Sequence, residues 1–389
     1  MKIPAWAPFA SLTAVASLGL AIFFTLYSLI PVTRADAPGL SSLFLGTMMA
    51  FVMGVQALTP ALVSRFSLRS VLAGSVALTA AGALITGMAA GTPALLAGAV
   101  AAGAGFGILI VAGSQGIALL VSANRLGRMI GIYGLVTMAA SALGSPIGVQ
   151  LALTFSPTVF GICAFIAGMI AVGLSFGVPA AVGRASAGLP ASGSVQRKPL
   201  AEGKKSGLRR MRDLVAGAPW LVLCFLLIGV VLLSHGLSSL PVLASAYGSA
   251  AVVIFSVQAG NALGRWLGGE LEAKTTTGAT IVTGAVLLAA GGVCGVFAAS
   301  STAAMVSGVL IGVGIGVVQT VTLHTAMRLL SAGRASVMWN LSVDAGLWVG
   351  GILWGLALTS RFVEGGVLLF SAAIILVGMM LVLQLRRKL

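Results

Sequence analysis

Residues 221–233 read LVLCFLLIGVVLL and residues 367–383 read VLLFSAAIILVGMMLVL, so both segments are apolar at nearly every position. The strands of a membrane β-barrel alternate polar and apolar side chains, and neither segment does so. An α-helix needs about 20 apolar residues to cross the hydrocarbon core of a bilayer. The two segments therefore predict membrane-spanning α-helices.

The composition of the whole chain agrees with these two segments. Of its 389 residues, 59% are hydrophobic and only 7% are charged. A water-soluble protein carries about 25% charged residues, because its surface must be solvated. We therefore exclude a soluble domain and expect an all-α polytopic membrane protein.

Charge and turn signals predict twelve spans. These are residues 9–31, 41–63, 70–91, 94–121, 128–153, 157–182, 216–239, 246–268, 277–298, 301–327, 335–360 and 364–385. The first apolar run is longer than the core of a signal peptide, so we expect it to remain as a span. Residues 184–213 are rich in Ser, Gly and basic residues, which predicts a flexible linker. The expected organisation is a six-helix bundle over 1–183, the linker, and a second six-helix bundle over 214–389.

The basic residues predict the orientation of these spans, because Lys and Arg are retained in cytoplasmic loops. Twenty of the 22 Lys and Arg residues fall on one side of the membrane, and only Arg34 and Arg361 fall on the other. A wrong number of spans would scramble this segregation. We therefore expect a multi-pass protein of the cell (inner or plasma) membrane with both termini in the cytoplasm.

Several classes of function lack support. The net charge of +15 comes from short loops and the linker without interleaved aromatic residues, so we expect contact with anionic lipid headgroups rather than nucleic acid. No nucleotide-binding motif, metal-ligand cluster or activated nucleophile is recognisable, which predicts neither an enzyme nor a bound metal or cofactor. Cys163, Cys224 and Cys294 lie in apolar runs without CxxC spacing, and we expect buried free thiols.

The second half of the sequence repeats features of the first. Gln115 lies ten residues before Arg125, and Gln319 lies nine residues before Arg328. A duplicated six-plus-six arrangement places a cavity between the halves near the midplane of the bilayer, as alternating access requires. Gln115 and Gln319 are therefore predicted at repeat-related positions, where they either contact the substrate or join helices by hydrogen bonds.

These features resemble the major facilitator superfamily of transporters over essentially the whole chain. Residues 60–69, PALVSRFSLR, are similar to the signature loop that follows the second span in that family. Arg65 and Arg69 match its basic positions, and the resemblance implies that they help to latch the two halves. Where the family usually has Gly, Asp and Gly, this chain has Pro60, Ser64 and Ser67. Alternatively, Arg65 and Arg69 cap the C-terminal ends of helices.

Residues 264–271, GRWLGGEL, resemble the corresponding family segment in the second half, which places Arg265 among the gating residues. We expect Arg265 to be an anchor at the edge of a loop, with a cation in the transport cavity as the alternative. The glycines of this segment, and the Gly-x-Gly runs over 103–107 and 312–316, predict close packing of helices.

Residues 142–148, ALGSPIG, are similar to a Gly and Pro motif in the fifth span of proton-driven drug exporters. Gly144, Pro146 and Gly148 are the matching residues. Pro146 removes a helix hydrogen bond and the glycines admit a neighbouring helix. Those exporters also carry an Arg in the fourth span, where this chain has Ala99. That departure speaks against proton antiport.

Asp344 is the acidic residue that falls well inside a predicted span, where an ionisable side chain is expensive. Asn340 lies four residues earlier on the same helix face, next to Trp339. We expect Asp344 to carry the coupled proton or to pair with a cationic substrate, and Asn340 and Trp339 to contact the substrate. The alternative is a protonated Asp344 that hydrogen-bonds a neighbouring helix.

Other polar residues within the spans are weaker candidates. His235 lies among Ser234, Ser238 and Ser239, and histidine titrates near neutrality, so it suits a proton relay. A structural histidine near the membrane surface is the alternative. Tyr27 is a further possible substrate contact. His324, one turn before Arg328, is expected at the cytoplasmic end of its helix.

The sequence thus predicts a secondary active transporter that moves a small molecule by alternating access, with proton-coupled efflux as the leading mechanism. An uptake permease or uniporter for a nutrient or organic anion is the alternative. A non-transporting membrane receptor or scaffold is a remote third reading. The expected partners are the substrate, protons and membrane lipid, and no obligate protein partner is indicated.

Overall fold

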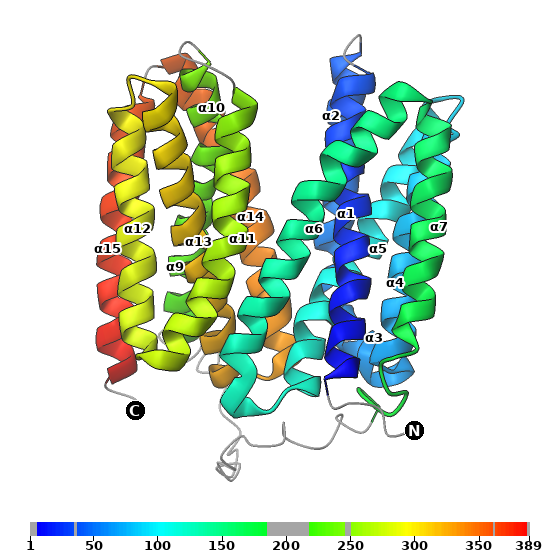
Figure 1. Cartoon of the computed structure of the whole chain (residues 1–389), viewed down its shortest axis with the longest axis horizontal. Helices are drawn as coiled ribbons and strands as arrows, with labels where there is room; N and C mark the ends of the chain where they lie inside the picture. The colour runs from blue at the N-terminus through cyan, green and yellow to red at the C-terminus, as the bar shows by residue number, and fades with distance from the viewer. Residues whose placement is uncertain (1–5, 35–36, 185–217, 246–249, 361, 387–389) are drawn as a thin grey trace, which may run out of the picture. The chain divides into compact units, whose positions relative to one another are not determined.

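The computed structural model describes residues 6–34, 37–184, 218–245, 250–360 and 362–386, and the regular elements in these ranges are helices (Figure 1). Eleven of these helices are long and apolar enough to cross a membrane. Helix α11, Ala250–Lys274, is not one of the eleven. It has 25 residues, and Gln258, Asn261 and Arg265 interrupt its apolar sequence. The expected all-α fold class is confirmed.

The chain divides into two compact units. The first contains Met1–Val121 and Val136–Ala191, and the second contains Ser122–Leu135 and Ser192–Leu389. The linker expected over 184–213 lies outside the described residues, except for Arg184. The predicted boundaries at 183 and 214 therefore stay predictions.

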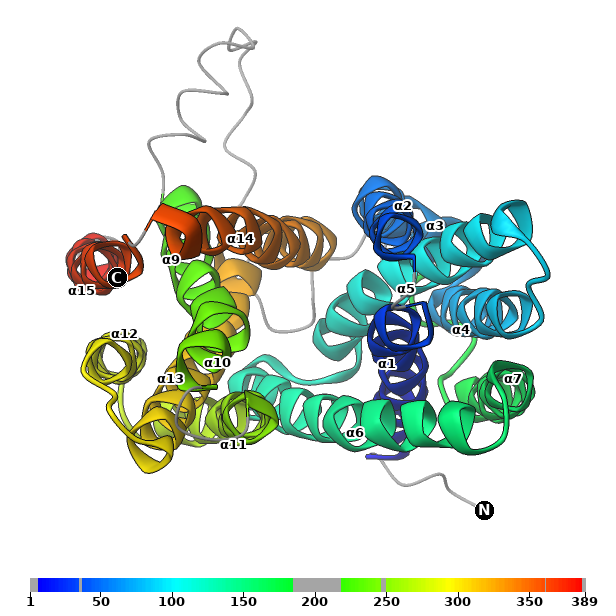
Figure 2. The same cartoon turned by 90° about the horizontal axis from the view of Figure 1, so that it is seen from above.

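The first unit is built around α5, which packs against α4, α2 and α1. Helix α7 closes this group by packing against α4 (Figure 2). The helices that contribute to this unit are α1 (Ala7–Thr33), α2 (Pro38–Gln56), α3 (Thr59–Phe66), α4 (Leu68–Gly87), α5 (Thr92–Leu120), most of α6 (Leu126–Thr154) and α7 (Pro157–Ser175).

The second unit repeats these pairings around α13, which packs against α11, α12 and α9. Helix α15 packs against α12 as α7 packs against α4. The elements of this unit are the 3-10 turn η1 (Ala123–Arg125), the start of α6, α9 (Ala218–Leu237), α10 (Ser239–Ala244), α11, α12 (Thr277–Val296), α13 (Ser301–Leu329), α14 (Ala332–Ser360) and α15 (Val363–Arg386).

The helix boundaries give the register of the internal repeat. Helix α5 begins and ends at residues 92 and 120, and α13 begins and ends at 301 and 329, a constant offset of 209. The same offset relates α4 to α12. Helices α6 and α14 differ by 206 at both ends. Repeat-related residues can therefore be paired by number.

The second, sixth and eighth predicted spans end differently from the expectation, and the eighth, predicted to end at residue 268, continues to Lys274 as α11. The second span, predicted over 41–63, is divided into α2 and α3, and Pro60 occupies the first turn of α3. Proline clashes with the preceding turn and lacks an N–H, so it begins a helix more easily than it continues one. The sixth span, predicted to reach residue 182, ends at Ser175 as α7.

The glycine runs pack helices together, as predicted. A methyl group at Gly103 or Gly107 would overlap the backbone of α2, and one at Gly312 or Gly316 would overlap the backbone of α11. These four glycines let the helix axes approach closely in both units.

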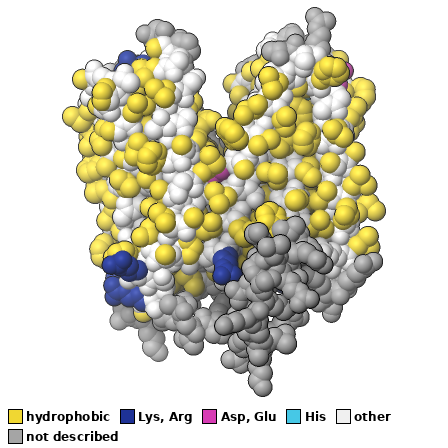
Figure 3. Space-filling view, turned by 180° about the vertical axis from the view of Figure 1, so that it is seen from behind, with side chains coloured by type: hydrophobic (Ala, Val, Ile, Leu, Met, Phe, Trp, Pro, Cys, Tyr) yellow, Lys and Arg dark blue, Asp and Glu magenta, His cyan; other side chains and the backbone are white. Residues whose placement is uncertain are grey.

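Apolar side chains cover much of the helix surface (Figure 3). The three cysteines lie on this surface as free, exposed residues, so the expectation that they are buried is wrong. In a bilayer, a helix can be apolar on the face that meets lipid as well as on the face that meets protein. An apolar run therefore does not show which of its residues are buried.

Candidate functional site

Arg265 is the most deeply buried basic side chain of α11, with 7% of its surface exposed. It lies nine residues before the end of the helix at Lys274, so the expected position at the edge of a loop is wrong. A guanidinium group inside a membrane-spanning bundle is costly and is usually functional. The alternative reading of Arg265 as a cation inside the bundle agrees with its position.

Two neighbouring helices hold the Arg265 side chain. Its Nε donates a hydrogen bond to Gln319 Oε1 on α13 at 3.0 Å. Its guanidinium carbon lies over the ring of Trp339 on α14, 5.4 Å from the ring centroid. Trp339 is fixed in turn, because its Nε1 donates to Thr322 Oγ1 at 3.1 Å. Three predicted site residues from three helices therefore meet in one cluster.

The start of α6 completes this cluster within the second unit. A methyl group at Gly134 would overlap the Arg265 side chain, so glycine makes room for it. Tyr133, the residue before Gly134, is also buried, with 7% of its surface exposed. Tyr133 and Trp339 are repeat-related at the offset of 206, a signal that the sequence analysis did not use. We call Arg265, Gln319, Trp339 and Tyr133 the arginine cluster.

Asp344 lies near the middle of α14 and is 7% exposed. Asn340, one turn earlier, is 6% exposed, and its Nδ2 donates to the Ser336 carbonyl at 2.8 Å. Among the described acidic residues, Glu270 and Glu272 lie in the last turns of α11 and Glu364 in the first turn of α15. Asp344 is therefore the acid at mid-helix in the described part of the chain.

His235 belongs to a different cluster. It is 1% exposed, its Nδ1 hydrogen-bonds Ser239 Oγ at 2.6 Å, and its ring lies 5.2 Å from that of Trp354. Trp354 is ten residues beyond Asp344 on α14, which is about 15 Å along a helix. The surroundings of Trp354 are apolar, including Val231 and Val367. His235 and Asp344 therefore do not share one polar cluster.

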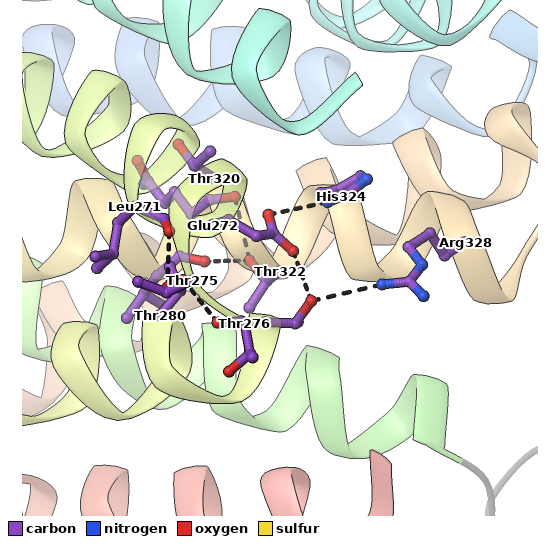
Figure 4. A network of polar contacts seen from close by, with 12 residues as sticks. Leu271, Glu272, Thr275, Thr276, Thr280, Thr320, Thr322, His324 and Arg328 are labelled. Carbon is purple, nitrogen blue, oxygen red and sulfur yellow. Dashed lines mark hydrogen bonds and ion pairs between the residues drawn. The ribbon is translucent and has the colours of Figure 1, made fainter. Parts of the chain in front are cut away.

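A second polar group lies near the end of α11, and the sequence analysis missed it. Glu272 forms an ion pair with His324 on α13, with 2.9 Å between Oε2 and Nδ1 (Figure 4). Thr277 donates to Glu272 Oε1 at 2.8 Å and accepts a hydrogen bond from Arg328 Nη1 at 3.5 Å. The Glu272 side chain is only 6% exposed. His324 is thus a paired residue near the end of its helix.

The loop that resembles the family signature holds α4 against α7. Arg69 Nε donates to the Val178 carbonyl at 2.6 Å, and its Nη2 donates to the Phe176 carbonyl at 3.2 Å. The cap at the end of a helix is thus borne out for Arg69. Arg65 is exposed over the Phe66 ring. Ser67 has φ of +88°, a conformation that favours glycine, which is the residue that the resemblance led us to expect at this position.

The Gly and Pro motif of α6 lies against α1. A methyl group at Gly144 would come within 2.6 Å of the Ala21 Cβ, and one at Gly148 would overlap Thr25. Thr25 Oγ1 lies 3.2 Å from the Gly144 carbonyl, and Pro146 lies between the two glycines inside the helix. The glycines admit a neighbouring helix, as expected.

The remaining predicted substrate contacts are less well placed. Tyr27 is 43% exposed on α1. Gln115 is buried, and its Oε1 accepts no hydrogen bond from the described residues. The offset of 209 pairs Gln115 with His324 rather than with Gln319, so the expectation that the two glutamines are repeat-related is wrong. The earlier pairing used the spacing between each glutamine and the basic residue that follows it, Arg125 or Arg328. The offset of 209 comes instead from the ends of α5 and α13.

The chain is similar in sequence pattern and in structure to known transporters. The sequence pattern of the Major Facilitator Superfamily matches residues 9–354. The fucose:proton symporter FucP of E. coli has a similar structure, with a TM-score of 0.73 and 13% identity over 98% of each chain. The proton:xylose symporter XylE has a TM-score of 0.73 and 16% identity over 98% of this chain and 95% of its own.

The human organic anion transporter MFSD10 has a TM-score of 0.69 and 15% identity over 99% of this chain and 100% of its own. No curated protein sequence matches the chain. At these identities, the three solved structures show a shared fold.

Proposed function

The chain belongs to the Major Facilitator Superfamily, and from that premise we propose that it exports a small organic molecule in exchange for protons. The sequence contains no recognisable ATP-binding motif, so a gradient of protons would supply the energy. Alternating access of the two halves would move the molecule across the bilayer.

The observation that carries proton coupling is the position of Asp344. It is buried at mid-helix in α14, one turn from Asn340. Ionisable groups at this depth mark ion and substrate pathways in membrane proteins. Asp344 would bind a proton on one side of the membrane and release it on the other, and Asn340 would contact the substrate. His235 is a candidate relay of lower rank, because its ring lies beside Trp354, which belongs to an apolar cluster.

The packing of the α6 motif supports export. Gly144 and Gly148 bring α6 against α1, the arrangement that the exporter-like motif requires. Uptake of a nutrient or organic anion is the second candidate. It is favoured by Ala99, by the altered signature loop, and by the names of two structural neighbours, FucP and XylE, which are proton symporters.

Flux measurements test coupling and direction separately. Purified protein in liposomes with an internal pH dye would be exposed to a panel of acidic, neutral and cationic compounds. We expect compound-dependent proton flux in the wild type and none above the empty-liposome background in Asp344→Asn. Glu364→Gln is the matched control, because it makes the same acid-to-amide change at an exposed position. Proton flux that is equal in Asp344→Asn and the wild type would remove Asp344 from the coupling step.

Energised everted vesicles give the direction. Accumulation of the compound inside them indicates export, and accumulation by whole cells indicates uptake.

The same cells test the membrane topology. The segregated Lys and Arg residues support cytoplasmic termini and a cytoplasmic linker over 184–213. A green fluorescent protein joined to either terminus should then fluoresce, whereas a periplasmic phosphatase joined there should be inactive.

A further inference from the structure

Neutral side chains hold the buried guanidinium group of Arg265. Arginine stays protonated in proteins, and this side chain is 93% buried in a membrane-spanning unit. Its side-chain partners are the neutral amide of Gln319 and the ring of Trp339, and the ion pairs of Glu270 and Glu272 are formed with Arg128 and His324. A cation in this environment needs an anion for part of the working cycle.

The geometry of the cluster leaves one edge of the guanidinium group for that anion. Gln319 accepts the hydrogen bond of Nε, so within the described part of the chain the two terminal nitrogens remain as an end-on fork. Thr320 Oγ1 donates to the Arg265 carbonyl at 3.0 Å and holds the backbone at this point of α11. The Trp339 ring lies against the guanidinium group and limits its rotation. The fork is thus oriented before any ligand arrives.

The chemistry of the cluster selects the class of ligand. A planar fork of N–H groups matches the two oxygens of a carboxylate. Within the arginine cluster Arg265 is the single cation, so one negative charge is balanced and a doubly charged phosphate is not. The Trp339 ring lies against the guanidinium group, which suits a ligand with an apolar or aromatic body.

We propose that the transported molecule is a small organic monocarboxylate, bound through its carboxylate to the terminal nitrogens of Arg265. Gln319 is a positioning residue that orients the fork, and Trp339 contacts the body of the ligand. This inference rests on the proposed function, since it names the substrate class of a transporter. It also gives Arg265 a role in substrate recognition, which the resemblance of residues 264–271 to a family segment does not imply.

Equilibrium binding to the full chain in lipid nanodiscs tests this assignment without passive leakage of weak acids. The probes are radiolabelled benzoate, phenylacetate and hexanoate, each beside its uncharged amide. We expect at least one carboxylate to bind and its matched amide to bind at least tenfold more weakly. In Arg265→Gln, carboxylate affinity should fall by about 10- to 100-fold, because a charge-assisted hydrogen-bonded pair is lost.

Two further variants separate recognition from folding. Arg265→Lys keeps the charge but not the fork, so affinity should lie between those of the wild type and Arg265→Gln. Gln319→Ala should weaken binding by about threefold to tenfold and leave the charge in place. Arg34→Gln changes an exposed arginine at the end of α1 and should bind as the wild type does. Monodisperse elution and unchanged helix content establish that each variant is folded.

The outcomes distinguish this inference from the proposed function. Failure of all three carboxylates to bind the wild type, or undiminished binding in folded Arg265→Gln, would overturn the carboxylate assignment. If cationic or neutral compounds drive proton flux in liposomes while carboxylates do not bind, the transporter stands and its substrate class is wrong. If carboxylates bind through Arg265 but no compound moves, the binding site stands and the proposed function falls.

Discussion

Helices α2 and α11 are repeat-related and pack through corresponding glycine contacts, yet they carry different polar side chains. In the first unit, Gly107 of α5 lies against the Val52 carbonyl of α2. In the second, Gly316 of α13 lies against the Asn261 carbonyl of α11. These pairs keep the offset of 209, which makes Gln56 the counterpart of Arg265.

The two helices diverge immediately after these residues. Helix α2 ends at Gln56, and Pro60 starts α3 shortly afterwards. Helix α11 continues past Arg265 to Lys274, with Gly269 at the position that corresponds to Pro60. The glycine contacts are thus shared by both units, whereas among the described residues the buried arginine belongs to the second unit. Packing follows the repeat, and the candidate chemistry departs from it.

The largest expected effect tests whether both units depend equally on their glycine contacts. Leucine at Gly107 or at Gly316 would overlap the backbone of the neighbouring helix, and overpacking of this kind costs about 3 kcal/mol or more. We expect little monodisperse protein from either variant in size-exclusion chromatography. Gly54→Leu on α2 is the control, because a methyl group there meets nothing within 4 Å. Normal yield from one of the two variants would show that the repeat does not extend to stability.

A smaller effect is confined to the first unit. Arg69 bonds two carbonyls beyond the end of α7, and its repeat counterpart, Gly278, has no side chain to do so. Arg69→Ala should lower the free energy of unfolding by about 1–2 kcal/mol. Thermal unfolding followed by circular dichroism measures this. Arg65→Ala should have no measurable effect, and an equal loss in both variants would contradict the role given to these bonds.

Opposite signs are expected at the helix starts that Ser67 and Thr276 occupy. Ser67 caps α4 with φ of +88°, whereas Thr276 caps α12 with φ of −124°. Glycine relieves backbone strain at the first position, so Ser67→Gly should raise stability by about 1 kcal/mol. Thr276→Gly relieves no strain and loses a cap, which costs a few tenths of a kcal/mol. Melting temperatures that shift in the same direction would refute the difference between the two turns.

The smallest effect concerns an ion pair that the repeat does not duplicate. Arg128 Nε lies 2.6 Å from Glu270 Oε1, and the two side chains are 48% and 22% exposed. The residues that correspond to Arg128 and Glu270 in the repeat are Arg334 and Ala61. The second copy of this pair therefore has an alanine in place of the acid. A double-mutant cycle of Arg128→Ala and Glu270→Ala should give a coupling below about 1 kcal/mol that shrinks in high salt. A larger, salt-insensitive coupling would indicate that the pair is shielded from solvent.

Much of the fold follows from the sequence, and some of the site does not. The glycine runs predicted close packing, because only glycine lets two helix backbones touch. Asp344 and Asn340 were found from their spacing of four residues on an apolar helix. Arg265 was misplaced because the glycines around it resemble a loop motif, and the sequence does not reveal that Gly268 and Gly269 continue a helix packed on α13.

Alone, the sequence determined that the chain spans a membrane as a duplicated set of helices, because a residue in lipid must satisfy its backbone hydrogen bonds within its own helix. Local composition is enough for that conclusion. Only the tertiary structure decided which apolar faces are buried, which polar residues meet and in which register the halves repeat. Those features depend on contacts between residues far apart in the chain: Arg265, Gln319 and Trp339 form one cluster because three helices bring them together.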